Sequence, residues 1–198
     1  RLIGIDRPGH GHTSRGPCDM SDPARQADLF AEVLDRLAAG RCVVLGHSWG
    51  ASVAAALAQR HPRRVAGLVL VAPATHPWPG GVSARARFFA LPYVGRLLSE
   101  IAVVPLGLVL ARAAIPAIFA PAAAPPRYFR RIGALLAIRP KTFVANARDV
   151  ADLYGHLVRL SARYHEIRTP TEILTPDIDP VVSPAIHAYG LARDIPGA

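Results

Sequence analysis

The stretch CVVLGHSWGASVAAALAQR, residues 42–60, decides the fold of this 198-residue chain. It opens with an apolar, β-branched run over 42–45, passes through GHSWG at 46–50, and continues into an alanine-rich run over 51–60. The first run predicts a strand, and the last predicts a helix. A serine between two glycines at this junction predicts a tight strand-to-helix turn that holds the Ser48 hydroxyl outward.

Two glycines, Gly46 and Gly50, flank Ser48 in this turn. We expect both to be required, because a Cβ at either position would collide with the neighbouring backbone. The turn lies at the carboxyl end of a strand, where open parallel sheets bind ligands. The helix that follows directs backbone N–H groups to the same place, so the N–H of Trp49 is a candidate donor to a developing oxyanion.

Further strands and helices are expected on both sides of this stretch. Asp22 and Pro23 have the residue types of an N-cap and a first helical position, and Gly40 has that of a residue just past a helix end. The additional elements are expected strands over 2–6, 65–72 and 172–175 and expected helices over 23–37 and 185–193. Strands that alternate with helices predict a parallel sheet with right-handed crossovers.

The middle of the chain is richer in proline and alanine and contains no strand-like run, which predicts a helical insertion. Its expected helices cover 82–91, 94–103, 126–137 and 142–164. We therefore expect a core over 1–75, a helical cap over 76–168 and a second part of the core over 169–198. The apolar stretch 101–120 is interrupted by Arg112 and two prolines, which favours an apolar lid over a membrane-spanning helix.

Composition excludes several classes of function. The net charge is +9, but aromatic residues make up only 7% of the chain, so we expect no nucleic-acid binding. The two cysteines are too few for a disulfide scaffold. Gly9 and Gly11 lack the third glycine of a dinucleotide fingerprint, and we expect neither a cofactor nor a metal. A basic chain favours anionic membrane surfaces, but the sequence locates no such site.

Three motifs resemble the α/β-hydrolase-fold superfamily, and in particular its capped serine hydrolases: DRPGHGHT at 6–13, GHSWG at 46–50 and PTEILTPDIDPVV at 170–182. This resemblance implies a partial α/β-hydrolase fold, with a mostly parallel sheet, flanking helices and a helical lid insertion. It also implies a triad in the chain order serine, acid, histidine, with Ser48 as the nucleophile.

The acid is expected in the loop that follows the last strand. Glu100 is the only acidic residue between Ala74 and Arg148, so the loop after the preceding strand offers no candidate. The family's Gly-x-x-Asp pattern implies Asp179, but Pro176 stands where the family has glycine. Asp177 therefore stays open as the alternative.

None of the eight histidines matches the family's position for the general base. We expect this histidine, together with the strands that supply the second oxyanion donor, to lie outside the 198 residues. The chain would then be a piece that folds poorly alone and is inactive. We expect His47 and His76 to contact the substrate.

The expected function is a serine hydrolase that cleaves the ester or lactone of an apolar small molecule through an acyl-enzyme on Ser48. Three alternatives stay open: a carbon–carbon bond hydrolase with the same triad, a ligand-binding protein without catalysis, and a peripheral membrane protein that uses residues 101–120. We expect no stable membrane insertion and a cytoplasmic location. The sequence does not indicate an oligomeric state.

Overall fold

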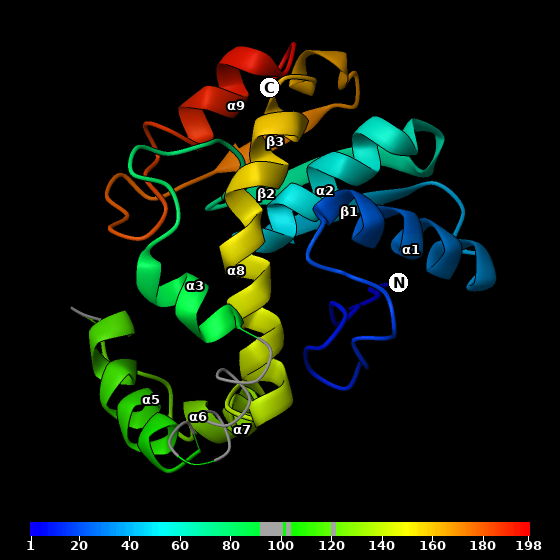
Figure 1. Cartoon of the computed structure of the whole chain (residues 1–198). Helices are drawn as coiled ribbons and strands as arrows, with labels where there is room; N and C mark the ends of the chain where they lie inside the picture. The colour runs from blue at the N-terminus through cyan, green and yellow to red at the C-terminus, as the bar shows by residue number, and fades with distance from the viewer. Residues whose placement is uncertain (92–100, 102–103, 120–121) are drawn as a thin grey trace. The chain divides into compact units, whose positions relative to one another are not determined.

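A computed structural model describes residues 1–91, 101, 104–119 and 122–198 of the chain (Figure 1). Its elements are α1 Pro23–Arg36, β1 Cys42–His47, α2 Trp49–Arg60, the short 3-10 helix η1 Pro62–Arg64, β2 Val65–Val71, α3 Ala84–Ala90, α5 Val104–Phe119, α6 Tyr128–Arg131, α7 Ala134–Ala137, α8 Pro140–Ser161, the 3-10 helix η3 Tyr164–Glu166, β3 Thr171–Leu174 and α9 Ala188–Asp194.

The three strands of the described residues form one parallel sheet in the order β1-β2-β3. Leu45 pairs with Val69 in β2, and Val69 pairs with Glu172 in β3, so β2 lies in the middle. Helices connect these strands, as the alternating pattern predicts. The parallel sheet with flanking helices confirms the expected fold class.

One face of this sheet is covered by α2, and α1 packs in turn on α2. Leu68 and Leu70 of β2 are buried in the resulting core, together with small side chains of α2 such as Ala51 and Ala55. On the other face Val43 and Leu45 of β1 are each 65% exposed. The strand expected over 42–45 is confirmed as part of β1.

Two further expectations about local structure are corrected. The apolar run over 2–6 forms no strand, because no described strand pairs with its backbone. Helix α1 begins as predicted, with the Asp22 side chain accepting a hydrogen bond from the Ala24 N–H at 2.8 Å. It ends earlier than Gly40, however, because Ala38 takes the left-handed conformation (φ 47°) and the Ala39 N–H bonds to the Leu34 carbonyl.

The central part of the chain is helical in its described residues, as expected. The helix predicted over 126–137 is divided into α6 and α7 by Gly133, whose φ is +63°. The helix predicted over 94–103 lies almost entirely outside the described residues. Helix α5, with Pro116 inside it, was not predicted as a helix. No helix in the described residues is both long enough and apolar enough to cross a membrane.

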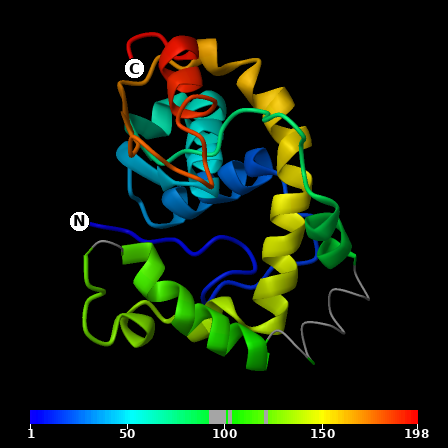
Figure 2. The ribbon, with the colours of Figure 1, turned by 90° about the vertical axis from the view of Figure 1, so that its left-hand side faces the viewer.

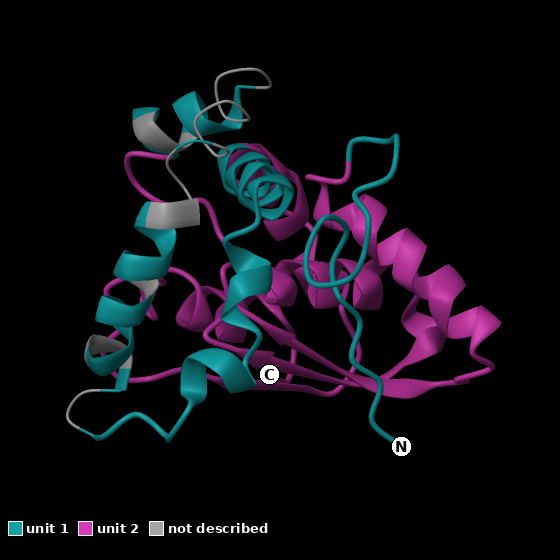
Figure 3. Cartoon of the chain, turned by 90° about the horizontal axis from the view of Figure 1, so that it is seen from below, with its two compact units in different colours: residues 1–19, 82–151 teal, residues 20–81, 152–198 magenta. Residues whose placement is uncertain are grey.

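The chain divides into two compact units (Figure 3). Unit 1 comprises residues 1–19 and 82–151, and unit 2 comprises residues 20–81 and 152–198. The whole sheet and every candidate site residue belong to unit 2. The predicted core and cap boundaries remain a prediction. Cys18 and Cys42 are both free.

Within unit 2, Gly46 is the residue that lets β1 turn directly into α2. A Cβ built on Gly46 would lie 2.6 Å from the Gly50 carbonyl oxygen and 2.7 Å from the Ala51 Cα. Backbone atoms at that distance cannot move aside as a flexible side chain can. Gly50 has only open space around the corresponding position, so the expectation that both glycines prevent a collision is confirmed for Gly46 and wrong for Gly50.

Gly46→Ala should lower the free energy of unfolding by about 1–3 kcal/mol or more, because the added methyl group overpacks the turn. Gly50→Ala is the matched control, and we expect it to be neutral or to stabilise by up to about 1 kcal/mol, because alanine is the better helix former. Urea unfolding followed by circular dichroism measures both. Equal effects of the two substitutions would contradict the assignment of the close approach to Gly46.

Candidate active site

Ser48 adopts a backbone conformation that is rare for a residue with a side chain, with φ 51° and ψ −119°. Its N–H donates to the Val71 carbonyl of β2 at 3.0 Å. Its own carbonyl accepts from the Ala51 N–H at 3.0 Å and from the Ala74 N–H at 3.2 Å. These bonds fix the turn between β1 and α2 from both sides and leave the Ser48 residue half-buried.

The residue after the serine, Trp49, is buried and is the first residue of α2. Because α2 runs for 12 residues from this position, its positive dipole end lies at the Ser48 turn. A negative charge that develops beside Ser48 is therefore favoured by the helix start. The assignment of the Trp49 N–H as an oxyanion donor remains a prediction.

Asp179 lies in the loop that leaves the same edge of the sheet. The three strands are parallel, so the turn after β1 and the loop after β3 both leave from their carboxyl ends. One carboxylate oxygen of Asp179, Oδ1, accepts from the Val181 N–H at 2.8 Å and from the Val182 N–H at 2.9 Å. These two bonds orient the Asp179 carboxylate within its loop.

Asp177 differs from Asp179 in both exposure and bonding. It is exposed, and the described residues supply no hydrogen bond to its side chain, whereas Asp179 is half-buried and held by two amides. The geometry therefore supports Asp179 over Asp177 as the ordered carboxylate. Its role as a triad acid remains a prediction.

The two histidines expected to contact substrate differ in their surroundings. His47 is the last residue of β1 and is exposed. His76 is buried: its Nε2 lies 3.1 Å from the Asp194 carboxylate, and its ring packs edge-on against Tyr164 at 5.3 Å between centroids. Burial lowers the pKa of His76, and the hydrogen bond to Asp194 opposes that shift.

No histidine in the described part of the chain hydrogen-bonds to Ser48 or to Asp179. The others with side-chain partners are His10 with Asp149, His61 with Asp28, His156 with Arg159 and Asp22, and His187 with the backbone of Thr75 and His76. Within the described residues, no three His, Cys, Asp or Glu side chains gather in a way that could hold a metal ion.

The structure gives His187 a partner that the sequence did not indicate. This histidine is only 5% exposed, and its Nδ1 accepts from the backbone N–H groups of Thr75 at 3.2 Å and His76 at 3.0 Å. A ring nitrogen that accepts two hydrogen bonds carries no proton, so the neutral ring has its proton on Nε2. His187 follows Thr75 by 112 positions and His76 by 111, and no local pattern encodes a contact at such a separation.

The loop held by His187 is the one that also contacts the serine turn. Ala74 donates its N–H to the Ser48 carbonyl, while the Ala74 carbonyl accepts from the hydroxyl of Ser52, which is buried in α2. The Thr75 carbonyl accepts from the buried Tyr164 hydroxyl at 3.0 Å. The backbone over 74–76 is thus held on every side, and it connects the serine turn to the start of α9.

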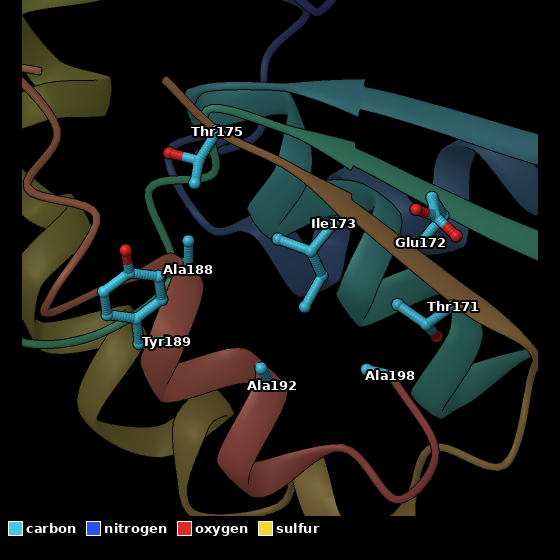
Figure 4. Close-up of a pocket in the computed structure, with 8 residues that line it drawn as sticks. All are labelled: Thr171, Glu172, Ile173, Thr175, Ala188, Tyr189, Ala192 and Ala198. Carbon is cyan, nitrogen blue, oxygen red and sulfur yellow. The ribbon is translucent and has the colours of Figure 1, made fainter. Parts of the chain in front are cut away.

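A cavity of about 290 Å³ lies elsewhere in unit 2, between the outer edge of β3 and α9 (Figure 4). Figure 4 shows Ile173 of β3 directed toward α9, with Tyr189 at one end of the cavity. None of the candidate site residues lines it. Because none of the candidate site residues contributes to it, we assign the chemistry to the serine turn and not to this cavity.

Known proteins with this arrangement identify the superfamily. The family model described as "alpha/beta hydrolase fold" matches residues 1–98, which include the Ser48 turn. A hydrolase of known structure from Pseudomonas aeruginosa superposes over 98% of this chain and 67% of its own, with a TM-score of 0.70 and 25% identity. The chain belongs to the α/β-hydrolase-fold superfamily.

Two other members of this superfamily show the range of chemistry among similar proteins. The chain is 35% identical over 95 residues to a 2-hydroxy-6-oxononadienedioate/2-hydroxy-6-oxononatrienedioate hydrolase of Burkholderia vietnamiensis, and the match spans 48% of this chain but only 31% of that enzyme. A structure described as an N-acyl homoserine lactone degrading enzyme is 27% identical, with a TM-score of 0.64, over 98% of this chain and 70% of its own.

In this hydrolase-fold chain, Asp179→Ala should lower the free energy of unfolding by about 1 kcal/mol, because two backbone N–H groups lose their acceptor. Asp177→Ala removes the same carboxylate from the same loop and should change it by less than about 0.5 kcal/mol. Urea unfolding measures both variants. A larger cost for Asp177→Ala would contradict the assignment of the ordered carboxylate.

His187 should make the stability of the chain depend on pH. Burial lowers its pKa to about 4, the neighbouring His76 adds to that shift, and Asp179 opposes it. An unfolded histidine has a pKa of about 6.5, so the unfolded chain binds the extra proton between about pH 6.5 and about pH 4. The stabilisation by neutral His187 is complete above about pH 6.5 and is lost as the pH falls from about 6.5 to about 4. We expect the free energy of unfolding to fall by about 1–2 kcal/mol over this range, after allowance for solvent screening.

The variant His187→Asn isolates this contribution, because the asparagine Oδ1 can accept the same two hydrogen bonds without titrating. Urea unfolding at about pH 4.5 and about pH 7 should show a smaller loss of stability for the variant than for the parent chain. Identical losses in the two proteins would show that His187 does not titrate in this window.

Proposed function

We propose that this chain carries the nucleophile and the acid of a serine hydrolase. The observation that carries the proposal is the Ser48 backbone at φ 51° and ψ −119°, between a strand and a helix, which turns the residue out of the sheet edge. A strained conformation held by three backbone hydrogen bonds supports a functional serine over an incidental one.

In the proposed reaction the Ser48 Oγ attacks the carbonyl carbon of the substrate, and a general base takes the hydroxyl proton. The backbone N–H of Trp49 donates to the oxyanion that forms. The base then gives the proton to the leaving alcohol, and an acyl-enzyme on Ser48 results. Water, activated by the same base, releases the acid and restores the serine.

Asp179 orients the base in this proposal. One of its oxygens is held by the Val181 and Val182 amides, which leaves the other oxygen in position to accept from a histidine N–H. Among the described residues no histidine hydrogen-bonds to Ser48 or Asp179, so we assign the base to none of them. His187 is not the base, since its Nδ1 is occupied by two amides.

The substrate that we propose is the ester or lactone of an apolar small molecule. The similarity to a lactone-degrading enzyme over nearly the whole of this chain supports an acyl substrate. A carbon–carbon bond hydrolase is the second candidate, and it is favoured by the 35% identity to the Burkholderia hydrolase. Both reactions use a serine in the same turn, so the two candidates differ in substrate and not in nucleophile.

A fluorophosphonate probe tests the nucleophile in the full 198-residue chain, with excess imidazole added as an external base. We expect the label on Ser48, within the tryptic peptide 42–60, where tandem mass spectrometry separates Ser48 from Ser52. Ser48→Ala should reduce labelling at least about 100-fold, because the attacking oxygen is gone. Ser161→Ala, at the end of α8, is the matched control and should label normally.

Labelling that survives Ser48→Ala, or a folded chain that takes no label at any imidazole concentration, would overturn the proposal in favour of a ligand-binding role. A panel of p-nitrophenyl esters, lactones and a 6-oxo-dienoate, tested with imidazole, then separates the two hydrolase candidates. Turnover of the dienoate without the esters would replace the ester hydrolase with the carbon–carbon hydrolase.

A further inference from the structure

The whole net charge of the chain belongs to unit 1 (Figure 3). Unit 1 has 13 Lys and Arg residues against four Asp and Glu residues, which is a formal charge of +9. Unit 2 has ten of each and is formally neutral. Such a one-sided distribution attracts anionic partners to one part of the molecule.

Helix α5 of unit 1, the green helix in Figure 2, has exposed apolar side chains along one side. Leu106, Val109 and Leu110 are 55%, 65% and 56% exposed, and Ala113 is exposed as well. These residues recur at the spacing of one helical face. A surface helix of a globular protein usually turns such a face inward, so this exposed stripe is a candidate contact surface.

Contacts within unit 1 fix which side of α5 faces inward. Phe119 packs edge-on against Tyr128 of α6 at 4.7 Å between ring centroids, and the Arg112 guanidinium lies 5.5 Å from the centre of the Phe129 ring. Leu108 and Ile115, on the opposite side of the helix from the stripe, are half-buried. The stripe over 106–113 is therefore the side that α5 turns away from α6.

Exposed cations accompany the stripe. Arg112 lies on α5 itself, and Arg127, Arg130 and Arg131 lie at the neighbouring α6. Among the residues that the structure describes, none of these four forms an ion pair with a carboxylate. Arg127, Arg130 and Arg131 are exposed and charged, and the Arg112 guanidinium lies over the Phe129 ring.

We propose that unit 1 binds an anionic lipid surface, with the apolar stripe of α5 lying in the headgroup region and the arginines of α5 and α6 contacting lipid phosphates. An apolar helical face with arginines on the remaining faces has the composition of helices that lie in the plane of a membrane. Helix α5 has 16 residues and an internal proline, which suits this orientation and not a span. A second copy is a poorer partner, because it would bring two units of charge +9 together.

Sedimentation with vesicles tests the proposal on the full chain and does not depend on hydrolysis. We expect binding to phosphatidylcholine vesicles that contain about 30% phosphatidylglycerol, little binding to phosphatidylcholine alone, and release at about 0.5 M salt. Leu106→Asp should weaken partitioning at least about tenfold, because it places a charge in the stripe. Val158→Asp, which adds the same charge at an exposed apolar position in unit 2, should leave binding within about twofold.

Two double variants, each of which removes two positive charges, test the role of the arginines. Arg130→Gln with Arg131→Gln should reduce partitioning at least about tenfold, since each basic residue near an anionic surface contributes roughly fivefold. Arg36→Gln with Arg63→Gln removes the same charge from unit 2 and should have a much smaller effect. Circular dichroism of every variant excludes unfolding as the cause.

A tryptophan at position 109 locates the contact, because both natural tryptophans, Trp49 and Trp78, belong to unit 2. The emission of Val109→Trp above this background should be quenched by brominated lipids. Three results would overturn the proposal: no vesicle binding, equal loss in the test and control variants, or a dimer that Leu106→Asp converts to a monomer. The last would assign the stripe to self-association.

Discussion

The backbone of Ser48 is held in a conformation that a residue with a Cβ adopts only when its surroundings enforce it. The enforcement comes from β2 through the Val71 carbonyl, from α2 through the Ala51 N–H, and from the loop after β2 through the Ala74 N–H. Each of these groups is in place only if β1 and β2 pair in parallel and α2 packs against them. The conformation of Ser48 therefore depends on the sheet, the helix and the turn together. Because Gly46 has no side chain, the start of α2 can pack closely against the end of β1.

The same constraint extends through buried polar contacts to the far side of unit 2. The backbone over 74–76 is bonded to Ser48 and Ser52 on one side and to His187 and Tyr164 on the other. Burying these polar groups would be costly without partners, and here each partner comes from a different part of the chain. A change in the protonation of His187 therefore acts on a loop that directly supports the serine turn.

The sequence predicts well those local features that depend only on residues close together in the chain. The Asp22 cap, the Pro23 start of α1 and the strand-to-helix turn at Ser48 depend on groups within a few positions of one another, and the structure has each of them. The end of α1 was missed because alanine at 38 took the left-handed conformation that glycine usually occupies. The strand expected over 2–6 does not form, because a strand requires a partner and no described strand pairs with these residues. His187 was missed because its acceptor role depends on amides more than 110 residues away.

Charge and chemistry are assigned to different parts of this chain. The serine turn and the Asp179 loop belong to a formally neutral unit, whereas the unit that contains α5 has a charge of +9. A neutral unit exerts little long-range attraction on an ionic substrate, which is consistent with an uncharged ester or lactone reaching Ser48. An uncharged apolar molecule also accumulates in lipid, because transfer out of water is favourable for its apolar surface. A cationic unit with an exposed apolar helix would then bring the neutral unit to the lipid surface, where its proposed substrate is concentrated. The residues that bind the lipid surface and the residues that bind the reacting group of the substrate are then different.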